Sequence, residues 1–275
     1  MNLNKIFDLS DKVIVVTGGC GLLGRKHCEA IAESGGIPVI LDLDGRRAEK
    51  LGEEISNTFL VDAAGYKVDV SKEEQVAENS KELIRRYGKI DCLVNNAANN
   101  SHITKKEKRN FSRLENFSFN EWETDIAVGL TGAFLCSKYY GFRISENPEG
   151  GVILNISSDL GLLAPDQRLY RDKTLSENEQ PTKPVSYSVV KSGLIGLTKY
   201  LSTYWPHKVR CNALCPGGVE NQQSQEFLSR IKNRIPMGRM AAIDEYQGAI
   251  IFLLSRASSY MNGETLLIDG GRSAW

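Results

Sequence analysis

Short runs of apolar residues alternate along the chain with longer segments in which apolar positions recur with a helical period. The short runs are rich in Val, Ile and Leu and predict buried strands, whereas the longer segments predict helices that cover a sheet. This alternation is typical of βα units that wind a parallel sheet. Seven strands are expected, at Val13–Thr17, Val39–Leu41, Tyr66–Val70, Ile90–Val94, Val152–Ile156, Arg210–Leu214 and Thr265–Asp269.

Two helix starts and two long connections stand out within this pattern. At Ser71–Glu74 and Ser118–Glu121 a Ser is followed three residues later by Glu, so that each side chain would satisfy a free backbone N–H. The connections at about 99–118 and 159–184 are longer than loops usually are, which favours a functional role. Both follow the carboxyl end of a parallel strand, where ligands bind in doubly wound folds.

The pattern contains no internal repeat and no low-complexity linker. A length of 275 residues is enough for one continuous core. We therefore expect an α/β fold, a doubly wound parallel sheet with helices on both faces, in a single domain over residues 1–275.

Charge and composition exclude several classes of partner. The 34 basic and 34 acidic side chains balance, which argues against nucleic acid or anionic lipid. The polar start is unlike a signal peptide, and no apolar run approaches the ~18 residues of a membrane span, so a cytoplasmic protein is expected. No metal site is expected, because His27, His102 and His207 form no ligand-spaced cluster. Without a CxxC pair, the cysteines are expected to be buried free thiols: Cys20, Cys28, Cys92, Cys136, Cys211 and Cys215.

A glycine-rich turn at 17–24 runs directly from the first strand into a helix. Glycine lets the backbone turn tightly and approach a pyrophosphate, while free N–H groups at the helix start attract negative charge. Asp42 ends the second strand, where a carboxylate accepts hydrogen bonds from the adenosine ribose of NAD and repels the 2′-phosphate of NADP. NAD is therefore favoured, although Arg46 and Arg47 leave NADP possible. Asp69 either contacts adenine together with Val70 or begins the next loop.

A second group of polar residues lies in the second half of the chain. Tyr187 and Lys191 are four positions apart in a helical segment, which places them on one helix face. Such a pair occurs often by chance. It gains weight because Ser158 follows the fifth strand and Asn96 follows the fourth.

These motifs resemble the short-chain dehydrogenase/reductase family, and the resemblance covers nearly the whole chain. It rests on the turn at 17–24, Asp42, Asn95-Asn96-Ala97-Ala98, Asn155-Ile-Ser-Ser158, Tyr187-x-x-x-Lys191, Pro216-Gly217 and Asp269-Gly270-Gly271. The resemblance implies a Rossmann-type domain, a homotetramer or dimer, and hydride transfer between a nicotinamide and an alcohol or carbonyl.

The resemblance also implies residue roles. Tyr187 would be the acid/base, Lys191 its partner and a ribose ligand, and Ser158 a donor to the substrate oxygen. A free Tyr has a pKa of about 10, and a nearby ammonium and oxidised nicotinamide would stabilise its phenolate. The implied cofactor-binding residues are Gly18, Cys20, Gly21, Leu22, Leu23, Asp42, Asp69, Val70, Asn96, Ala97, Ala98, Tyr187, Lys191, Pro216, Gly217 and Val219.

Three features depart from the family pattern. Gly18-x-x-Gly21-x-x-Gly24 has the spacing of the extended, nucleotide-sugar branch, although the length and the ending resemble the shorter branch. Gly129 stands where an Asn normally completes a proton relay, so another residue or water arrangement must substitute. Ser158 and Tyr187 are also much further apart in sequence than the family pattern suggests.

The two long loops bear on the substrate, because both are rich in charge. We interpret them as a polar, partly basic roof over a hydroxyl-rich substrate that could be phosphorylated or nucleotide-linked, with Asp159, Gln167 and Arg168 as candidate contacts. The alternative is an ordinary solvated loop surface. The charged and polar loop residues include His102, Lys105, Lys106, Lys108, Arg109, Arg113, Asp166, Tyr170, Arg171, Asp172, Lys173, Glu177 and Glu179.

The segments 158–168, 183–187 and 236–240 resemble a subgroup linked to flagellin modification and surface-glycan biosynthesis. That resemblance implies a sugar-pathway oxidoreductase, for example in nonulosonic acid synthesis. Two other functions stay open: a sugar-nucleotide epimerase or dehydratase that recycles its NAD, and a cofactor-binding protein that has lost catalysis.

Overall fold

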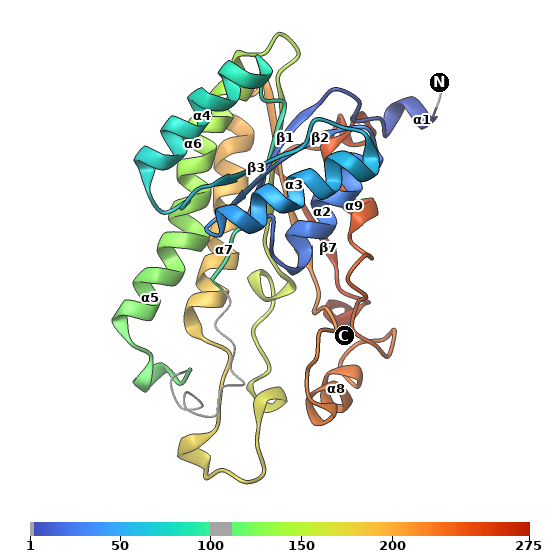
Figure 1. Cartoon of the computed structure of the whole chain (residues 1–275). Coiled ribbons are helices and arrows are strands. Elements are labelled where there is room, and N and C mark those ends of the chain that lie inside the picture. Colours follow the sequence, from blue (N-terminus) through green and yellow to red (C-terminus); the bar gives the residue numbers. More distant parts are fainter. Residues whose placement is uncertain (1–2, 100–111) are drawn as a thin grey trace.

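One parallel sheet of seven strands organises the computed structural model, which describes residues 3–99 and 112–275 (Figure 1). The strand order is β3-β2-β1-β4-β5-β6-β7, and every neighbouring pair is parallel. The order reverses direction between β1 and β4, which creates the crevice where doubly wound sheets bind ligands. The strands are β1 Val13–Thr17, β2 Ile37–Asp42, β3 Ala64–Lys67, β4 Cys92–Asn95, β5 Gly151–Ile156, β6 Val209–Pro216 and β7 Thr265–Ile268.

Helices cover both faces of this sheet, as the sequence predicts. Alternate residues of β1 belong to different core clusters: Ile14 packs toward α2, α3 and α9, and Val15 packs toward α4, α6 and α7. This alternation follows from the two-residue side-chain period of a strand. The helices are α1 Leu3–Ile6, α2 Leu22–Glu33, α3 Gly45–Phe59, α4 Glu73–Tyr87, α5 Phe119–Ile126, α6 Gly132–Glu146, α7 Val185–Tyr204, α8 Gln225–Lys232 and α9 Gln247–Leu254.

Two local predictions need correction. The third strand lies at Ala64–Lys67 and ends before Val70, because Asp69 turns the chain by accepting hydrogen bonds from the backbone N–H and hydroxyl of Ser71. Ser71 consequently caps nothing, and α4 begins at Glu73 without a side-chain cap. At α5 the first half of the predicted box holds, since Ser118 accepts from the backbone N–H of Glu121.

The two long connections meet beyond the carboxyl edge of the sheet. Thr182 donates its backbone N–H and its hydroxyl to Ser112, at 3.0 and 2.7 Å, and Arg113 donates to the carbonyl of Glu177. Segment 159–184 also packs Leu169 against α8, with which it forms a small separate hydrophobic cluster. Figure 1 shows this segment extending below the sheet between α5 and α8. The predicted roof residues His102, Lys105, Lys106, Lys108 and Arg109 lie outside the described residues.

Within residues 3–99 and 112–275, none of the helices is both long and apolar enough to cross a bilayer. All six cysteines are free, and Cys20 alone among them is only partly buried.

Candidate active site

The glycine-rich turn after β1 is held in place by the end of β4. Thr17 Oγ1 accepts hydrogen bonds from the backbone N–H groups of Asn96 and Ala97, both at 3.0 Å. The Asn96 amide in turn donates to the carbonyls of Thr17 and Gly18. Gly18 has φ +60° and lies against Ala97, so a side chain there would be strained and crowded. Asn96 therefore shapes the turn rather than merely lining its surface.

The shape of this turn fits a bound pyrophosphate. A Cβ at Gly24 would come within 2.2 Å of the Gly18 carbonyl oxygen, so only glycine lets α2 start this close to the turn. Gly21 precedes α2 and provides no side-chain cap. The first N–H groups of α2, from Leu22 onward, are unsatisfied by the helix itself and are suited to phosphate oxygens.

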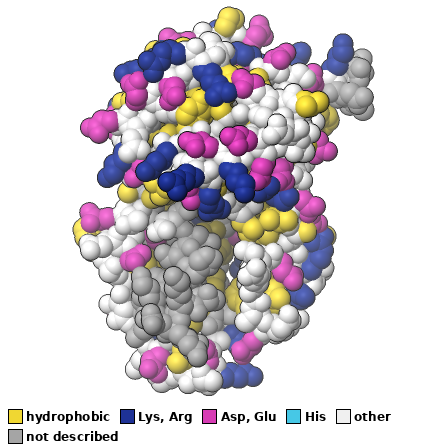
Figure 2. All heavy atoms as spheres, viewed as in Figure 1, with side chains coloured by type: hydrophobic (Ala, Val, Ile, Leu, Met, Phe, Trp, Pro, Cys, Tyr) yellow, Lys and Arg dark blue, Asp and Glu magenta, His cyan; other side chains and the backbone are white. Residues whose placement is uncertain are grey.

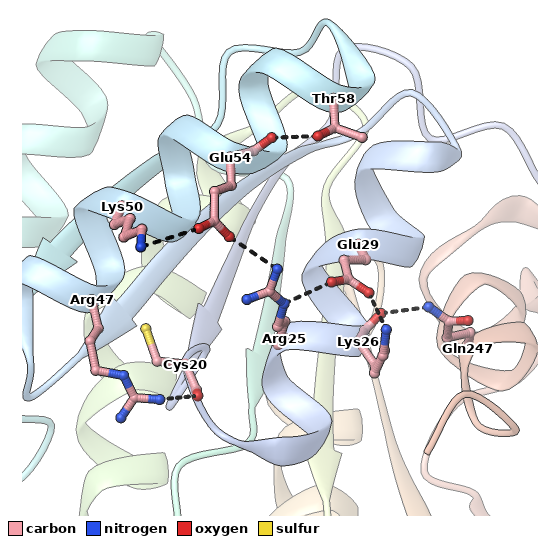
Figure 3. Close-up of polar contacts among 9 residues, drawn as sticks. All are labelled: Cys20, Arg25, Lys26, Glu29, Arg47, Lys50, Glu54, Thr58 and Gln247. Atoms are coloured by element: carbon pink, nitrogen blue, oxygen red, sulfur yellow. Dashed lines mark hydrogen bonds and ion pairs between the residues drawn. The ribbon is translucent and has the colours of Figure 1, made fainter. Parts of the chain in front are cut away.

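At the end of β2, Asp42 lies beside the same turn. Its carboxylate accepts the backbone N–H groups of Cys20, at 3.0 Å, and Asp44, at 3.2 Å. Arg47 reaches from α3 to the carbonyl of Cys20, at 3.0 Å, as Figure 3 shows. A negative and a positive side chain thus flank the position predicted for the adenosine ribose.

Ion pairs behind the turn fix α2 against its neighbours. Arg25 bridges Glu29 and Glu54, which joins α2 to α3, and Gln247 of α9 donates to the carbonyl of Lys26 (Figure 3). These contacts make the start of α2 a rigid edge of the crevice.

A shallow surface pocket opens next to Asp42. It is lined by Leu43, Asp44, Gly45, Arg46, Glu49 and Lys67. Figure 2 shows Lys and Arg side chains gathered with Asp and Glu across the middle of this face. Val70 is buried in the core, and the carboxylate of Asp69 accepts hydrogen bonds from the backbone N–H and the hydroxyl of Ser71.

The three predicted catalytic residues come together at the carboxyl ends of β5 and β6. Lys191 is 6 % exposed and donates from Nζ to the carbonyl of Ile156, at 2.8 Å. The Ser157 hydroxyl donates to the carbonyl of Lys191, at 2.6 Å, which ties α7 to the end of β5. Tyr187 lies close enough to the hydroxyl of Ser158 for that hydroxyl to lower its pKa. The long insertion between Ser158 and Tyr187 therefore leaves their contact intact.

Burial sets the electrostatics of this group. It raises the pKa of Tyr187, an effect that the hydrogen bond from Ser158 partly offsets. Burial also lowers the pKa of Lys191 to about 8, with a further contribution from the nearby Lys183. From the sequence, the ammonium of Lys191 is expected to lower the pKa of Tyr187. In the protein without cofactor, the effect of burial is larger, and the pKa of Tyr187 is raised.

Gly129 has no room for the Asn of the family pattern. It lies in a π-helical turn, Ala127–Thr131, between α5 and α6. A Cβ at Gly129 would come within 2.5 Å of Val190 Cγ1. The ammonium group of Lys191 donates a hydrogen bond to the backbone carbonyl of Ile156.

Four further residues lie around Ser158 and Tyr187, and the catalytic motif fixes none of them. Asp159 accepts from the Ser158 hydroxyl, at 2.9 Å, and pairs with Arg272 near the end of the chain, at 2.6 Å. Lys183 Nζ lies 3.6 Å from the centroid of the Tyr187 ring. Tyr170 is close enough that Tyr187, Arg272 and Asp159 all affect its pKa, which burial raises to about 12.

The other predicted substrate contacts lie further out. Gln167 accepts the backbone N–H of Lys183, at 2.8 Å, and so supports the lysine from behind. The side chain of Arg168 is 69 % exposed and pairs with Asp166. Both residues contribute to the wall of segment 159–184, but neither contacts Ser158, Tyr187 or Lys191 through a hydrogen bond or ion pair within the described chain.

The end of β6 completes the crevice. Gly217 donates its N–H to the carbonyl of Ile268 and accepts from the hydroxyl of Tyr246. Val219 forms an isolated bridge with Ala241. Pro216 closes the strand, so the predicted nicotinamide-side residues share the sheet edge with Ser158. Ala98 lies exposed beyond β4.

Known proteins share this architecture and these motifs. A family model described as enoyl-(acyl carrier protein) reductase matches residues 22–273. The 3-oxoacyl-(acyl-carrier-protein) reductase of Aquifex aeolicus is 33% identical over 268 residues, 96% of this chain and 98% of its own length. The chain belongs to the short-chain dehydrogenase/reductase family. It is accordingly an oxidoreductase of the NAD(P)-dependent kind that acts on alcohol and carbonyl groups.

Two further family members are relevant to the substrate. A gluconate 5-dehydrogenase from Burkholderia cenocepacia, solved with NADP and tartrate, has a TM-score of 0.86, 27% identity and full coverage of both chains. The post-translational flagellin modification protein A of Campylobacter coli is 26% identical over 264 residues, 96% of this chain and 98% of its own length. The family is thus shown, whereas these relatives differ among themselves in substrate.

Within the described chain, no cluster of three or more His, Cys, Asp or Glu side chains could hold a metal ion.

Proposed function

We propose that the protein is an NAD-dependent dehydrogenase of a polar, hydroxyl-rich substrate, a sugar, sugar phosphate or nucleotide sugar of glycan biosynthesis. The observation that carries this proposal is the assembly of Ser158, Tyr187 and Lys191 next to a charged wall built from segment 159–184. An apolar acyl chain would be poorly matched to that wall. The similarity to a flagellin modification protein supports a role in glycan synthesis.

Each residue of the site has a separate role in this proposed reaction. The turn at 18–24 and the start of α2 hold the pyrophosphate, and Asp42 binds the adenosine ribose. A nicotinamide held there would supply the hydride acceptor or donor. Tyr187 takes the proton of the substrate hydroxyl during oxidation, Ser158 donates to the same oxygen, and Lys191 binds the nicotinamide ribose. The remaining residues implied to line the cofactor would be Ala97, Ala98, Pro216, Gly217 and Val219, with Val70 packed behind them in the core.

NAD is the proposed cofactor because of the charge at Asp42. Its carboxylate is fixed by two backbone N–H groups, so it cannot swing away from a 2′-phosphate without breaking both bonds. Arg47 is engaged with Cys20, although only through one donor. Calorimetric titration with NAD and NADP tests this directly, and tighter binding of NADP would contradict the preference.

The substrate class is tested by absorbance assays with NAD against sugar phosphates and nucleotide sugars. Sustained NADH formation is expected. The rival function, an epimerase or dehydratase with recycled NAD, predicts product formation without net NADH. The Gly18-x-x-Gly21-x-x-Gly24 spacing favours that rival, and net NADH formation decides between the two functions.

We also propose that the protein is a homotetramer or dimer. Large apolar side chains are exposed on α6 and α7, where nothing in the described chain covers them: Phe134, Phe142, Val189, Tyr200 and Tyr204. Sedimentation velocity tests this assignment, and a monomer at micromolar concentration would contradict it.

A further inference from the structure

Lys183 is a cation beside Tyr187 to which the proposed mechanism assigns no role. It ends the long segment 159–184, two residues before α7 begins at Val185. Its backbone is held by Gln167, and its Nζ lies 3.6 Å from the centroid of the Tyr187 ring. Across residues 3–99 and 112–275, its ammonium makes neither a hydrogen bond nor an ion pair.

The acidic groups nearest to Lys183 are already engaged. Asp159 binds Arg272 at 2.6 Å and also accepts from Ser158 and from the backbone N–H of Leu160. Asp125 accepts from Ser186 and from the amide of Asn99. Both carboxylates attract Lys183 only at longer range.

Among the described residues, the charges around Tyr187 do not cancel. Lys183, Lys191 and Arg272 provide three positive charges, and Asp159 and Asp125 provide two negative ones. Burial lowers the pKa of Lys183 to about 8, so it stays largely protonated at neutral pH. A partly dehydrated ammonium has already lost some of its hydration. It therefore gains more from an arriving anion than an exposed lysine does.

We propose that Lys183 forms a subsite for an anionic group of the substrate, a carboxylate or phosphate carried a few atoms from the carbinol that is oxidised. This proposal rests on the proposed function and narrows its substrate class. A carbinol oxygen bound at the Tyr187 hydroxyl leaves the rest of the substrate beside the ring, next to the ammonium. Tyr170 lies close enough to Tyr187, Arg272 and Asp159 to interact with their charges, and a tyrosine hydroxyl is able to donate to an anion.

A matched set of six-carbon probes tests the subsite. D-sorbitol is neutral, D-gluconate carries a carboxylate and D-sorbitol 6-phosphate carries a phosphate. Their dissociation constants are measured by calorimetry, with and without saturating NAD. We expect at least one anionic probe to bind about tenfold or more tightly than sorbitol, and the preferred anion distinguishes carboxylate from phosphate.

Three variants distinguish this role of Lys183 from a general effect of positive charge in the segment. Lys183→Met should reduce the preference for the anionic probe over sorbitol to near unity. Lys173→Met removes an exposed lysine of the same segment and should leave the preference intact. Lys183→Arg keeps a cation and should retain most of the preference, which guards against a misfolded Met variant.

The outcomes distinguish the subsite from the proposed function. Equal binding of neutral and anionic probes, or a preference that survives in Lys183→Met, overturns the subsite. Anion-selective binding that depends on Lys183, but without NADH formation from any probe or sugar derivative, supports the subsite and contradicts the dehydrogenase.

Discussion

Arg272 is ion-paired with Asp159 at 2.6 Å, so the end of the chain contacts the residue beside Ser158. Both side chains are largely buried, with exposed fractions of 13% and 4%. The other oxygen of Asp159 accepts the Ser158 hydroxyl. Arg272 therefore balances a carboxylate that competes with the substrate for the Ser158 proton.

Replacing Arg272 by Leu should reduce stability and turnover together. The change leaves Asp159 buried without its partner, which costs about 3 kcal/mol in the free energy of unfolding. Urea denaturation measures this loss. The double variant Arg272→Leu with Asp159→Asn should regain much of the stability, because no unpaired charge remains. If the single variant were as stable as the native protein, the ion pair would not be buried as described.

The charge at Asp42 should decide between NAD and NADP. Asp42→Asn keeps one oxygen, which can still accept one of the two N–H groups of Cys20 and Asp44, and it removes the charge that repels a 2′-phosphate. The ratio of NADP to NAD affinity should rise about tenfold. Asp44→Asn is the matched control, since it changes the same charge at the start of α3. Equal shifts in both variants would show that the effect is not specific to Asp42.

A buried histidine should make stability depend on pH. His27 is 1% exposed, its ring nitrogens have no hydrogen-bond partner within the described chain, and burial lowers its pKa from 6.5 to about 3. The unfolded chain binds a proton below pH 6.5 and the folded chain does not. Stability is therefore fully present above that pH and is lost as the pH falls toward 3.

Between pH 7 and pH 5 the loss from His27 should be about 2 kcal/mol. His27→Gln, which does not titrate, should remove this part of the slope in urea denaturation. The exposed His207→Gln should leave it unchanged. The same slope in all three proteins would place its origin elsewhere.

The activity should depend on pH through Tyr187. Oxidation of an alcohol needs its phenolate, whereas reduction of a carbonyl needs its phenol. Because burial raises the pKa of Tyr187, kcat/KM for oxidation should increase from neutral to alkaline pH, and that for reduction should decrease. Initial rates in both directions measure this. Parallel profiles would be inconsistent with a single acid/base.

The alternation of short apolar runs with longer helical segments was enough to predict the sheet. Strands that are buried on both faces are apolar at every position, so each run stands out in the sequence. Val13–Thr17 and Val152–Ile156 show this most clearly. The third strand was harder, since its burial is only partial and Asp69 and Ser71 form a local turn that resembles a helix cap.

The site was predictable where a motif fixes the spacing, as it does for Tyr187 and Lys191 on one turn of α7. Lys183 and Arg272 had no such signal. Arg272 reaches Asp159 across more than a hundred residues of sequence, and Lys183 faces Tyr187 only because Gln167 and the loop contacts of Thr182 place it there. Contacts of this kind depend on the tertiary fold rather than on periodicity.

The central claim is that Tyr187 transfers the proton while NAD takes the hydride, and one comparison tests it most directly. NADH formation and NAD binding are measured in the native protein and in Tyr187→Phe, with the best substrate of the sugar-derivative screen. Turnover should fall by about a thousandfold or more, while the dissociation constant for NAD stays within about twofold. A Tyr187→Phe variant that turns over at the native rate would contradict the account.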